Sequence, residues 1–379
     1  MSFLPWRRAR APAPDPALPQ IVLGAMREDR ERFAGLDGVR ALVYFPHGFG
    51  DWVHLGSIAP LLEASNTYAV TRFGDDFVAL MEGNRYLTPL LSGVRDVGDG
   101  SERGARHFGL ALRGCNGGRA TLSLPPPLDE AVMRFAPEVL LWTDYPETEG
   151  RTPYPFHTKA RNLARLLVRP ERLQQFDLSQ PLVSTIDFAA PLEVQQRHDD
   201  RVATLAPPGT RLCIISRAGA TAARKAWGHG AQAQALVANL RAQDPRWRFV
   251  SLDEDSLGAG CAGFRELFGD LDEPFARSYK ALLARTDLVI GVPSGPLHAA
   301  MARGGIPIVG LWRAHHPDWY DEPNAQAMHL VGRYVRDRGF HRRPATRTKP
   351  ASLQHRIAYL DSVEIPLEAV VESARQLTS

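Results

Sequence analysis

The sequence is poor in cysteine and has no long apolar run. Its 379 residues include three cysteines, which lie far apart and form no CxxC pair: Cys115, Cys213 and Cys261. This spacing argues against a disulfide framework and a cysteine-based metal site, so we expect reduced thiols in a cytoplasmic protein. No segment approaches the roughly 20 consecutive apolar residues that a membrane-spanning helix requires. We therefore do not expect the chain to cross a bilayer.

The charge balance and the first residues exclude two further classes. The formal net charge of +3 is too small for nucleic-acid binding along the whole chain, and we expect no nucleic-acid partner. Residues 1–20 carry three arginines but lack the apolar segment that a secretory signal contains. We expect a disordered leader here. The alternative is that its arginines and neighbouring apolar side chains contact an anionic membrane surface.

The sequence does contain an alternation of apolar strands and helices in both halves. Its length exceeds the range in which one hydrophobic core keeps growing, which predicts two domains. Residues 287–311 show the alternation most clearly. The apolar run 288–292 leads through a tight turn into a short helix, which Gly304 and Gly305 end before a second strand. This pattern is typical of a βαβ unit in a parallel sheet.

From this alternation we predict an α/β fold with two doubly wound domains that face each other across a cleft. Ligands of such folds bind outside the carboxyl ends of the parallel strands. The predicted N-terminal domain covers residues 21–190, and the C-terminal domain covers residues 191–330. Residues 331–350 are expected to form a basic loop, either solvated or in contact with a phosphorylated acceptor or an anionic membrane. Residues 351–379 are expected to form a closing helical segment.

Within the βαβ unit, the turn at residues 293–296 (Pro-Ser-Gly-Pro) is a candidate anion site. Ser294 stands where a helix N-cap belongs. The first backbone N–H groups of a helix have no partner within it, and the helix dipole favours negative charge there. We therefore expect an anion at this turn, although a crossover without a ligand is the alternative.

Three separated stretches carry a family resemblance. They are 50–54 (Gly-Asp-Trp-Val-His), 221–227 (Thr-Ala-Ala-Arg-Lys-Ala-Trp) and 294–300 (Ser-Gly-Pro-Leu-His-Ala-Ala). In this order they resemble the heptosyltransferases of glycosyltransferase family 9, over roughly residues 38–320. The resemblance implies the GT-B fold, with two Rossmann-like domains. It also implies transfer of a sugar from a nucleotide diphosphate donor with inversion, without a metal ion or another cofactor.

The resemblance also implies roles for individual residues. Asp51 matches the general base that takes the proton from the acceptor hydroxyl, although capping of the following helix is the alternative. Thr221 and Lys225 match phosphate-binding positions, where a hydroxyl and a lysine charge suit a diphosphate leaving group. Ser294 and Gly295 are expected to offer backbone N–H groups to the same diphosphate.

The remaining positions are less clearly defined by the resemblance. His298 is interpreted either as a contact to the sugar or as a core histidine. Glu254 follows a predicted strand, where the family often places an acidic residue toward the nucleotide ribose. The triplet 253–255 (Asp-Glu-Asp) also matches the DxD metal motif of a different glycosyltransferase fold, which two doubly wound halves disfavour. At Pro293 the family usually has an Asp that contacts the donor sugar, so the resemblance leaves that sugar undefined.

These residues predict a glycosyltransferase that acts on the hydroxyl of a glycan or glycolipid, of the lipopolysaccharide type or another surface glycan. We expect it in the cytoplasm, with peripheral contact at the inner face of the membrane. Two alternatives stay open. A nucleotide-sugar epimerase on the same fold requires additional acid–base groups around the sugar. A noncatalytic nucleotide-sugar-binding relative is favoured by Pro293.

Overall fold

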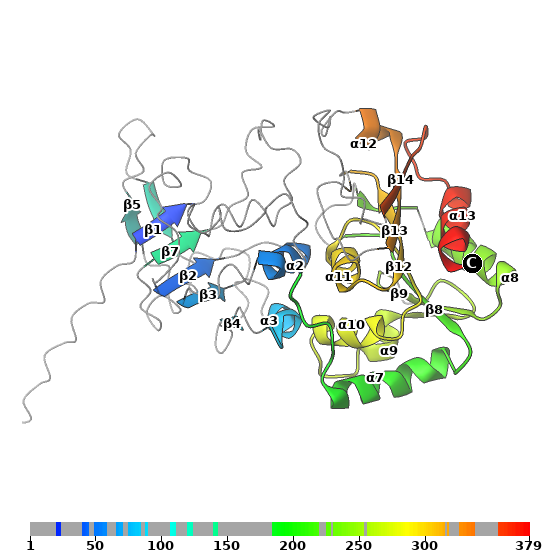
Figure 1. Cartoon of the computed structure of the whole chain (residues 1–379), viewed down its shortest axis with the longest axis horizontal. Helices are drawn as coiled ribbons and strands as arrows, with labels where there is room; N and C mark the ends of the chain where they lie inside the picture. The colour runs from blue at the N-terminus through cyan, green and yellow to red at the C-terminus, as the bar shows by residue number, and fades with distance from the viewer. Residues whose placement is uncertain are drawn as a thin grey trace, which may run out of the picture.

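The computed structural model contains two parallel β-sheets with associated helices (Figure 1). It describes residues 184–379 except 220–224, 229, 254–255, 315–316, 318–325 and 338–354. Before residue 184 it describes the elements named below and residues 82–84. The expected leader lies outside the described residues apart from Gln20.

The first sheet has five parallel strands in the order β1-β7-β2-β3-β4. These are β1 (Gln20–Leu23), β2 (Arg40–Tyr44), β3 (Asn66–Val70), β4 (Thr88–Pro89) and β7 (Val139–Trp142). An antiparallel pair is formed by β5 (His107–Leu110) and β6 (Ala120–Ser123). Helix α2 (Phe49–Ile58) connects β2 to β3, and α3 (Asp75–Met81) connects β3 to β4. This half therefore has the predicted alternation of strands and helices.

The second sheet has seven parallel strands in the order β10-β9-β8-β11-β12-β13-β14. They are β8 (Arg211–Ser216), β9 (Trp247–Ser251), β10 (Cys261–Gly263), β11 (Leu288–Gly291), β12 (Pro307–Trp312), β13 (Gln326–Val331) and β14 (His355–Tyr359). From β8 the chain moves outward to β10, then returns to β11 and continues in the other direction. The fold is therefore doubly wound, and the strand order reverses between β8 and β11.

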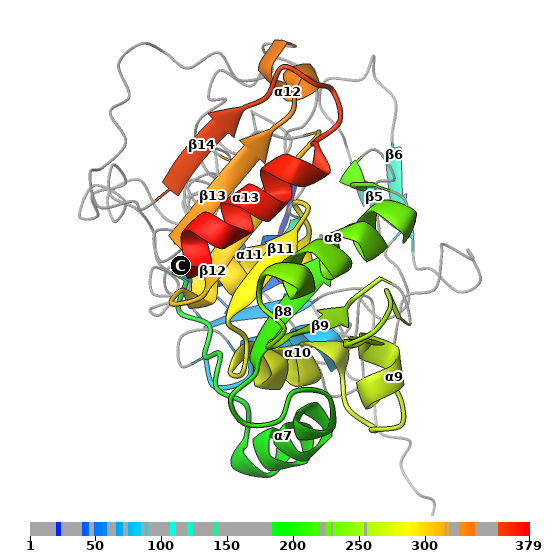
Figure 2. The ribbon, with the colours of Figure 1, turned by 90° about the vertical axis from the view of Figure 1, so that its right-hand side faces the viewer.

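Helices cover both faces of this sheet (Figure 2). The helices of this half are α7 (Leu192–Leu205), α8 (Gly230–Gln243), α9 (Phe264–Phe268), α10 (Phe275–Leu283), α11 (Gly295–Arg303), α12 (Arg333–Asp337) and α13 (Leu367–Thr378). Because side chains alternate along a strand, Leu212 and Ile214 of β8 pack in the core with α10 and α11. Cys213 and Ile215 pack on the opposite face with α8 and α13.

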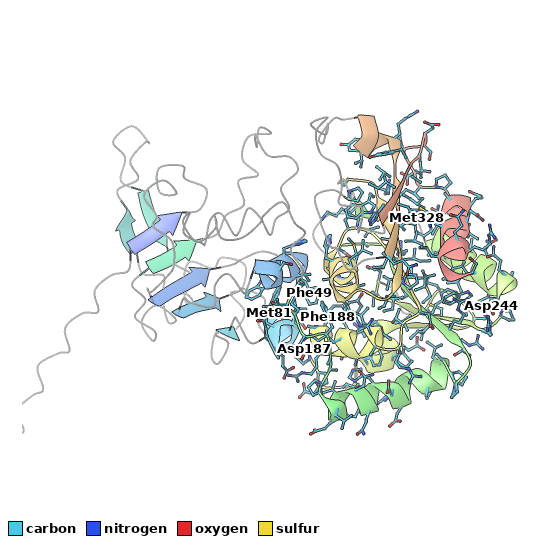
Figure 3. All side chains as sticks on the ribbon, viewed as in Figure 1. Phe49, Met81, Asp187, Phe188, Asp244 and Met328 are labelled. Carbon is cyan, nitrogen blue, oxygen red and sulfur yellow. The ribbon has the colours of Figure 1, made fainter. Side chains whose placement is uncertain are left out.

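The two helices of the first half pack against the second half. The ring of Phe49 in α2 lies 5.9 Å from that of Phe275 in α10. The carboxylate of Asp76 in α3 accepts the backbone N–H of Ala276 at 3.1 Å. Figure 3 shows Phe49 and Met81 where α2 and α3 meet α11 and α10. Apolar residues of both helices consequently belong to one core with the second sheet.

Three elements differ from the sequence-based expectation. Helix α7 begins directly after Pro191, in the stretch 144–200 whose many prolines predict a connection between the two domains. The expected basic loop begins with α12, and the expected closing helical segment includes β14 before α13. Strand β14 pairs with β13 along its whole length, so this strand depends on a distant partner and has little local signal.

Candidate functional site

The candidate site lies where the strand order reverses, at the carboxyl ends of β8 and β11. These strands are paired in register, with Ser216 beside Gly291 at their ends. The segments that follow them, 217–219 with 225–228 and 292–295, therefore emerge side by side. In open α/β sheets this is the position at which ligands bind.

The start of α11 has the features of an anion site. Ser294 is at the predicted N-cap, with φ −141° and ψ 169°, but its hydroxyl makes no capping hydrogen bond. Among the described residues, its buried Oγ has no hydrogen-bond partner. The first bond of the helix runs from the His298 N–H to the Ser294 carbonyl, so the N–H groups of Gly295 and Leu297 have no partner within the helix. The buried Tyr279 hydroxyl donates to the Pro296 carbonyl at 2.9 Å and holds this first turn in place.

The end of β8 is arranged differently, because a carboxylate already occupies its backbone donors. Asp253, just after β9, accepts hydrogen bonds from the backbone N–H groups of Arg217 and of Ala218, the latter at 3.2 Å. A second anion at those N–H groups would be repelled by this carboxylate. These N–H groups are therefore engaged within the protein, in contrast to those of Gly295 and Leu297, which have no partner within α11. The same bonds give Asp253 a structural role in the loop after β8, which weakens the DxD interpretation.

Gly219 brings the β8 loop close to the α11 turn. A Cβ atom at Gly219 would lie 3.7 Å from the Ser294 Cβ and 3.9 Å from the Lys225 Cδ. The stem of the Lys225 side chain therefore passes beside the start of α11. This places a lysine and a helix N-terminus together, although they are 69 positions apart in the sequence (294 − 225).

Helix α2 approaches the same turn through two glycines. A Cβ at Gly50 would lie 2.6 Å from the His298 Cδ2 and 3.3 Å from the Gly295 Cα. A Cβ at Gly295 would lie 2.7 Å from the Phe49 Cβ. Side chains at either glycine would thus collide with the other helix. Asp51 follows Gly50 directly, so its backbone lies in the first turn of α2, next to the first turn of α11.

A row of buried aromatic residues continues from this contact. The His298 ring lies 5.4 Å from that of His54 in α2 and 6.4 Å from that of Trp312 in β12, between ring centroids. The Trp312 indole N–H donates to Nδ1 of His329 at 2.9 Å. His298 itself is only 4% exposed. The structure thus gives His298 a packing position between α2 and β12.

Of the predicted site residues, the structure brings together Lys225, Ser294, Gly295 and His298. The side chain of Asp51 lies outside the described residues, and so do Thr221 and Glu254 as a whole. In the part of the chain that the structure describes, no group of three His, Cys, Asp or Glu residues could hold a metal ion. No described helix has the length and apolar character that crossing a membrane requires.

Sequence reasoning missed the residues that hold the Lys225 turn. Arg313, just after β12, donates from its Nη1 to the carbonyl of Ala226 and pairs through its Nη2 with Glu364. Trp227 is fully buried, and its indole N–H donates to the Ile365 carbonyl at 2.8 Å. Arg313 directly follows the carboxyl end of a strand, and this position could have marked it as a candidate site residue. Its partners become apparent only in the folded chain.

Comparisons with solved structures identify the fold. No protein-family model and no curated protein matches the sequence. A glycosyl transferase of family 9 from Veillonella parvula DSM 2008 matches with a TM-score of 0.52 and 17% identity, over 91% of this chain and 98% of that one. The ADP-heptose lps heptosyltransferase II of E. coli matches with a TM-score of 0.52 and 11% identity, over 89% of this chain and 98% of that one. The chain therefore has the α/β fold of family 9 glycosyltransferases, which confirms the predicted fold.

Proposed function

We propose that this protein is an inverting, metal-independent glycosyltransferase. It moves a sugar from a nucleotide diphosphate donor to a hydroxyl acceptor. The observation that carries the proposal is the meeting of Lys225, the start of α11 and the first turn of α2 at the point where the strand order reverses. Fold similarity to two glycosyltransferases supports the same class of reaction.

The leaving diphosphate is stabilised by two kinds of positive charge in this proposal. Departure of the sugar increases the negative charge on the diphosphate, and preorganised donors that meet this charge lower the barrier. Lys225 contributes a full charge, while Gly295 and Leu297 contribute N–H groups and the dipole of α11. The uncapped hydroxyl of Ser294 is a further donor beside them. Together these groups serve the function that a divalent cation serves in metal-dependent transferases.

Asp51 is the proposed general base. It belongs to the first half of the chain, so donor and acceptor are held from opposite sides of the α2–α11 contact. Thr221 is proposed as a further phosphate ligand, Glu254 as a contact to the nucleotide ribose, and His298 as a residue that supports the sugar-binding side of α11. Pro293 is buried and offers neither a carboxylate nor an N–H, so the donor sugar must be held by other groups.

The similar E. coli enzyme is named for an ADP-heptose donor and a lipopolysaccharide acceptor. By analogy, we propose a nucleotide-sugar donor and a glycan or glycolipid acceptor of the surface type. Such an acceptor places the protein in the cytoplasm with peripheral contact at the inner face of the membrane. The excess of arginine after residue 332 is consistent with that contact.

A noncatalytic nucleotide-sugar-binding protein is the second candidate, and Pro293 is the observation that favours it. Both functions predict binding of the nucleotide, but only the glycosyltransferase predicts turnover. Transfer of sugar to any acceptor would exclude the noncatalytic protein.

The proposal is tested by the effect of Lys225→Ala on nucleotide binding. Titration calorimetry with ADP, GDP, UDP and CDP identifies the tightest ligand of the wild type. Its affinity should fall by about 1.5–3 kcal/mol in Lys225→Ala, as expected for a hydrogen bond to a charged group. Arg246→Ala is the control, because this exposed, ion-paired residue directly precedes β9 and so lies at the amino ends of the strands, away from the site at their carboxyl ends. Equal affinity of wild type and Lys225→Ala would exclude the phosphate assignment.

Activity should also survive removal of metal ions. Once turnover is found, the enzyme is assayed after exhaustive EDTA treatment and again with added Mn²⁺. Loss of activity with EDTA and recovery with Mn²⁺ would contradict metal independence and would favour a metal site at residues 253–255.

A further inference from the structure

The turn that carries Lys225 is held by the end of the chain. The backbone N–H of Trp227 donates to the Arg217 carbonyl at 2.8 Å, which ties the turn to β8. On its other side, the indole N–H of Trp227 donates to the Ile365 carbonyl at 2.8 Å. The position of Lys225 therefore depends on a segment that is 140 positions further along the sequence (365 − 225).

Arg313 forms the second connection between this turn and the end of the chain. It follows β12 directly, and its side chain is 21% exposed. One guanidinium nitrogen, Nη1, donates to the carbonyl of Ala226, the residue after Lys225. The other, Nη2, pairs with Glu364. Because the guanidinium is planar and rigid, binding both partners fixes the Ala226 carbonyl relative to Glu364.

We infer that Arg313 is a positioning residue for the phosphate site. It holds the backbone next to Lys225, so that the lysine side chain is directed to the start of α11. The charge of Arg313 itself is paired with Glu364. The side chains of Ser294 and Lys225 both border the Gly219 position, where a Cβ atom would make ordinary van der Waals contacts with each of them. This inference rests on the proposed function, because it needs a diphosphate at Lys225.

A double-mutant cycle tests whether Arg313 acts through Lys225. The dissociation constant of the tightest nucleoside diphosphate is measured for wild type, Arg313→Gln, Lys225→Ala and the double variant. In the wild-type background, Arg313→Gln should weaken binding by about 5-fold, as expected for loss of hydrogen bonds that order the site. In the Lys225→Ala background, the same change should have an effect of less than about 2-fold, because groups that act as one unit are not additive.

Two further variants separate positioning from general loss of structure. Arg313→Lys retains the charge but not the planar pair of donors, so it should restore less than half of the lost affinity on a logarithmic scale. Glu364→Gln, at an exposed carboxylate, should weaken binding in the same direction as Arg313→Gln and also only when Lys225 is present. Arg246→Gln breaks an ion pair with Asp244 far from the site and should leave binding unchanged. If Arg313→Gln does not fold, Glu364→Gln carries the cycle with Lys225→Ala.

The outcomes distinguish this inference from the proposal on which it rests. An equal loss from Arg313→Gln in both backgrounds would overturn the inference, because Arg313 would then contact the ligand itself or act on the whole fold. No loss in either background would overturn it as well. Unchanged binding in the single variant Lys225→Ala would instead overturn the proposed phosphate site, whatever Arg313 does.

Discussion

At the scale of single residues, two charged side chains around the site form contacts that stabilise its loops. Asp253 is bound by two backbone N–H groups, and Arg313 is paired with Glu364. These charges stabilise the loops after β8 and β12 and are therefore already engaged within the protein. Lys225 and Asp51 are the charged residues that the proposal assigns to the donor and the acceptor.

Asp51→Asn separates an enzyme from a binding protein. The substitution preserves size and helix-capping ability but removes the group that accepts the proton of the acceptor. Turnover should fall by roughly 100-fold or more, since general-base catalysis contributes about 10²–10⁴-fold. The dissociation constant of the nucleotide should change by no more than a few-fold. Steady-state sugar transfer and calorimetry measure the two effects, with melting temperature as the control for folding. Normal turnover would show that Asp51 only supports the first turn of α2.

At the scale of elements, α2 and α11 lie in close contact because two positions in their first turns carry no side chain. Gly50 and Gly295 allow the first turns of the helices to touch, and this contact brings the Asp51 backbone to the α11 turn. Without it, the proposed base and the proposed phosphate site would be on separate elements. The contact is therefore part of the site as well as of the core.

Gly50→Ala tests this contact. The added methyl group would lie 2.6 Å from the His298 Cδ2, so the helices must separate. Overpacking of this kind destabilises proteins by about 1–3 kcal/mol, of which better helix propensity offsets up to about 1 kcal/mol. Urea unfolding should therefore show a net loss of stability. The loss should shrink when the same change is made in a His298→Ala background, where the nearest colliding atom is absent. An equal loss in both backgrounds would contradict the collision.

At the scale of the whole molecule, α3 and α10 join the halves through charged groups around a buried lysine. Arg277 pairs with Glu82 at 3.0 Å, and Lys280 Nζ donates to the Glu82 carbonyl at 3.4 Å. Lys280 is only 2% exposed. Burial lowers the pKa of Lys280 to about 8, although the carboxylates of Asp187 and Glu82 raise it in part. The junction between the halves thus contains a group that titrates in mildly alkaline solution.

Lys280 predicts a pH dependence of the free energy of unfolding. The unfolded chain keeps the lysine proton up to about pH 10.4, whereas the folded protein loses it near pH 8. Between these values the unfolded state binds more protons, so this group makes stability rise with pH, by at most about 1.4 kcal/mol per unit. Lys280→Met should therefore be more stable than wild type at pH 7, and its advantage should decrease from pH 8 to 10. Burial raises the pKa of the Cys213 thiol in the folded protein, and the resulting pH dependence is the same in both variants and cancels in the difference. A constant difference in urea unfolding across this range would contradict the prediction.

Much of the second half was determined by local sequence. The strands β8, β9 and β11 are apolar runs with clear ends. Ser294 and Gly304 end α11 on either side as expected, because an extended N-cap and a glycine with φ 69° need only local backbone chemistry. The α/β class likewise follows from the alternation of strands and helices along the chain.

The tertiary structure decided the features that depend on distant partners. Strand β14 is defined by pairing with β13, and α7 by the face that it buries on α10. The carboxylate of Asp253 accepts the backbone N–H groups after β8 only because β9 ends beside β8. In the same way, Arg313 can position Lys225 only because the chain returns with Glu364 and Ile365. Such contacts join residues whose local sequence carries no sign of each other, since each is satisfied only when the sheet is assembled.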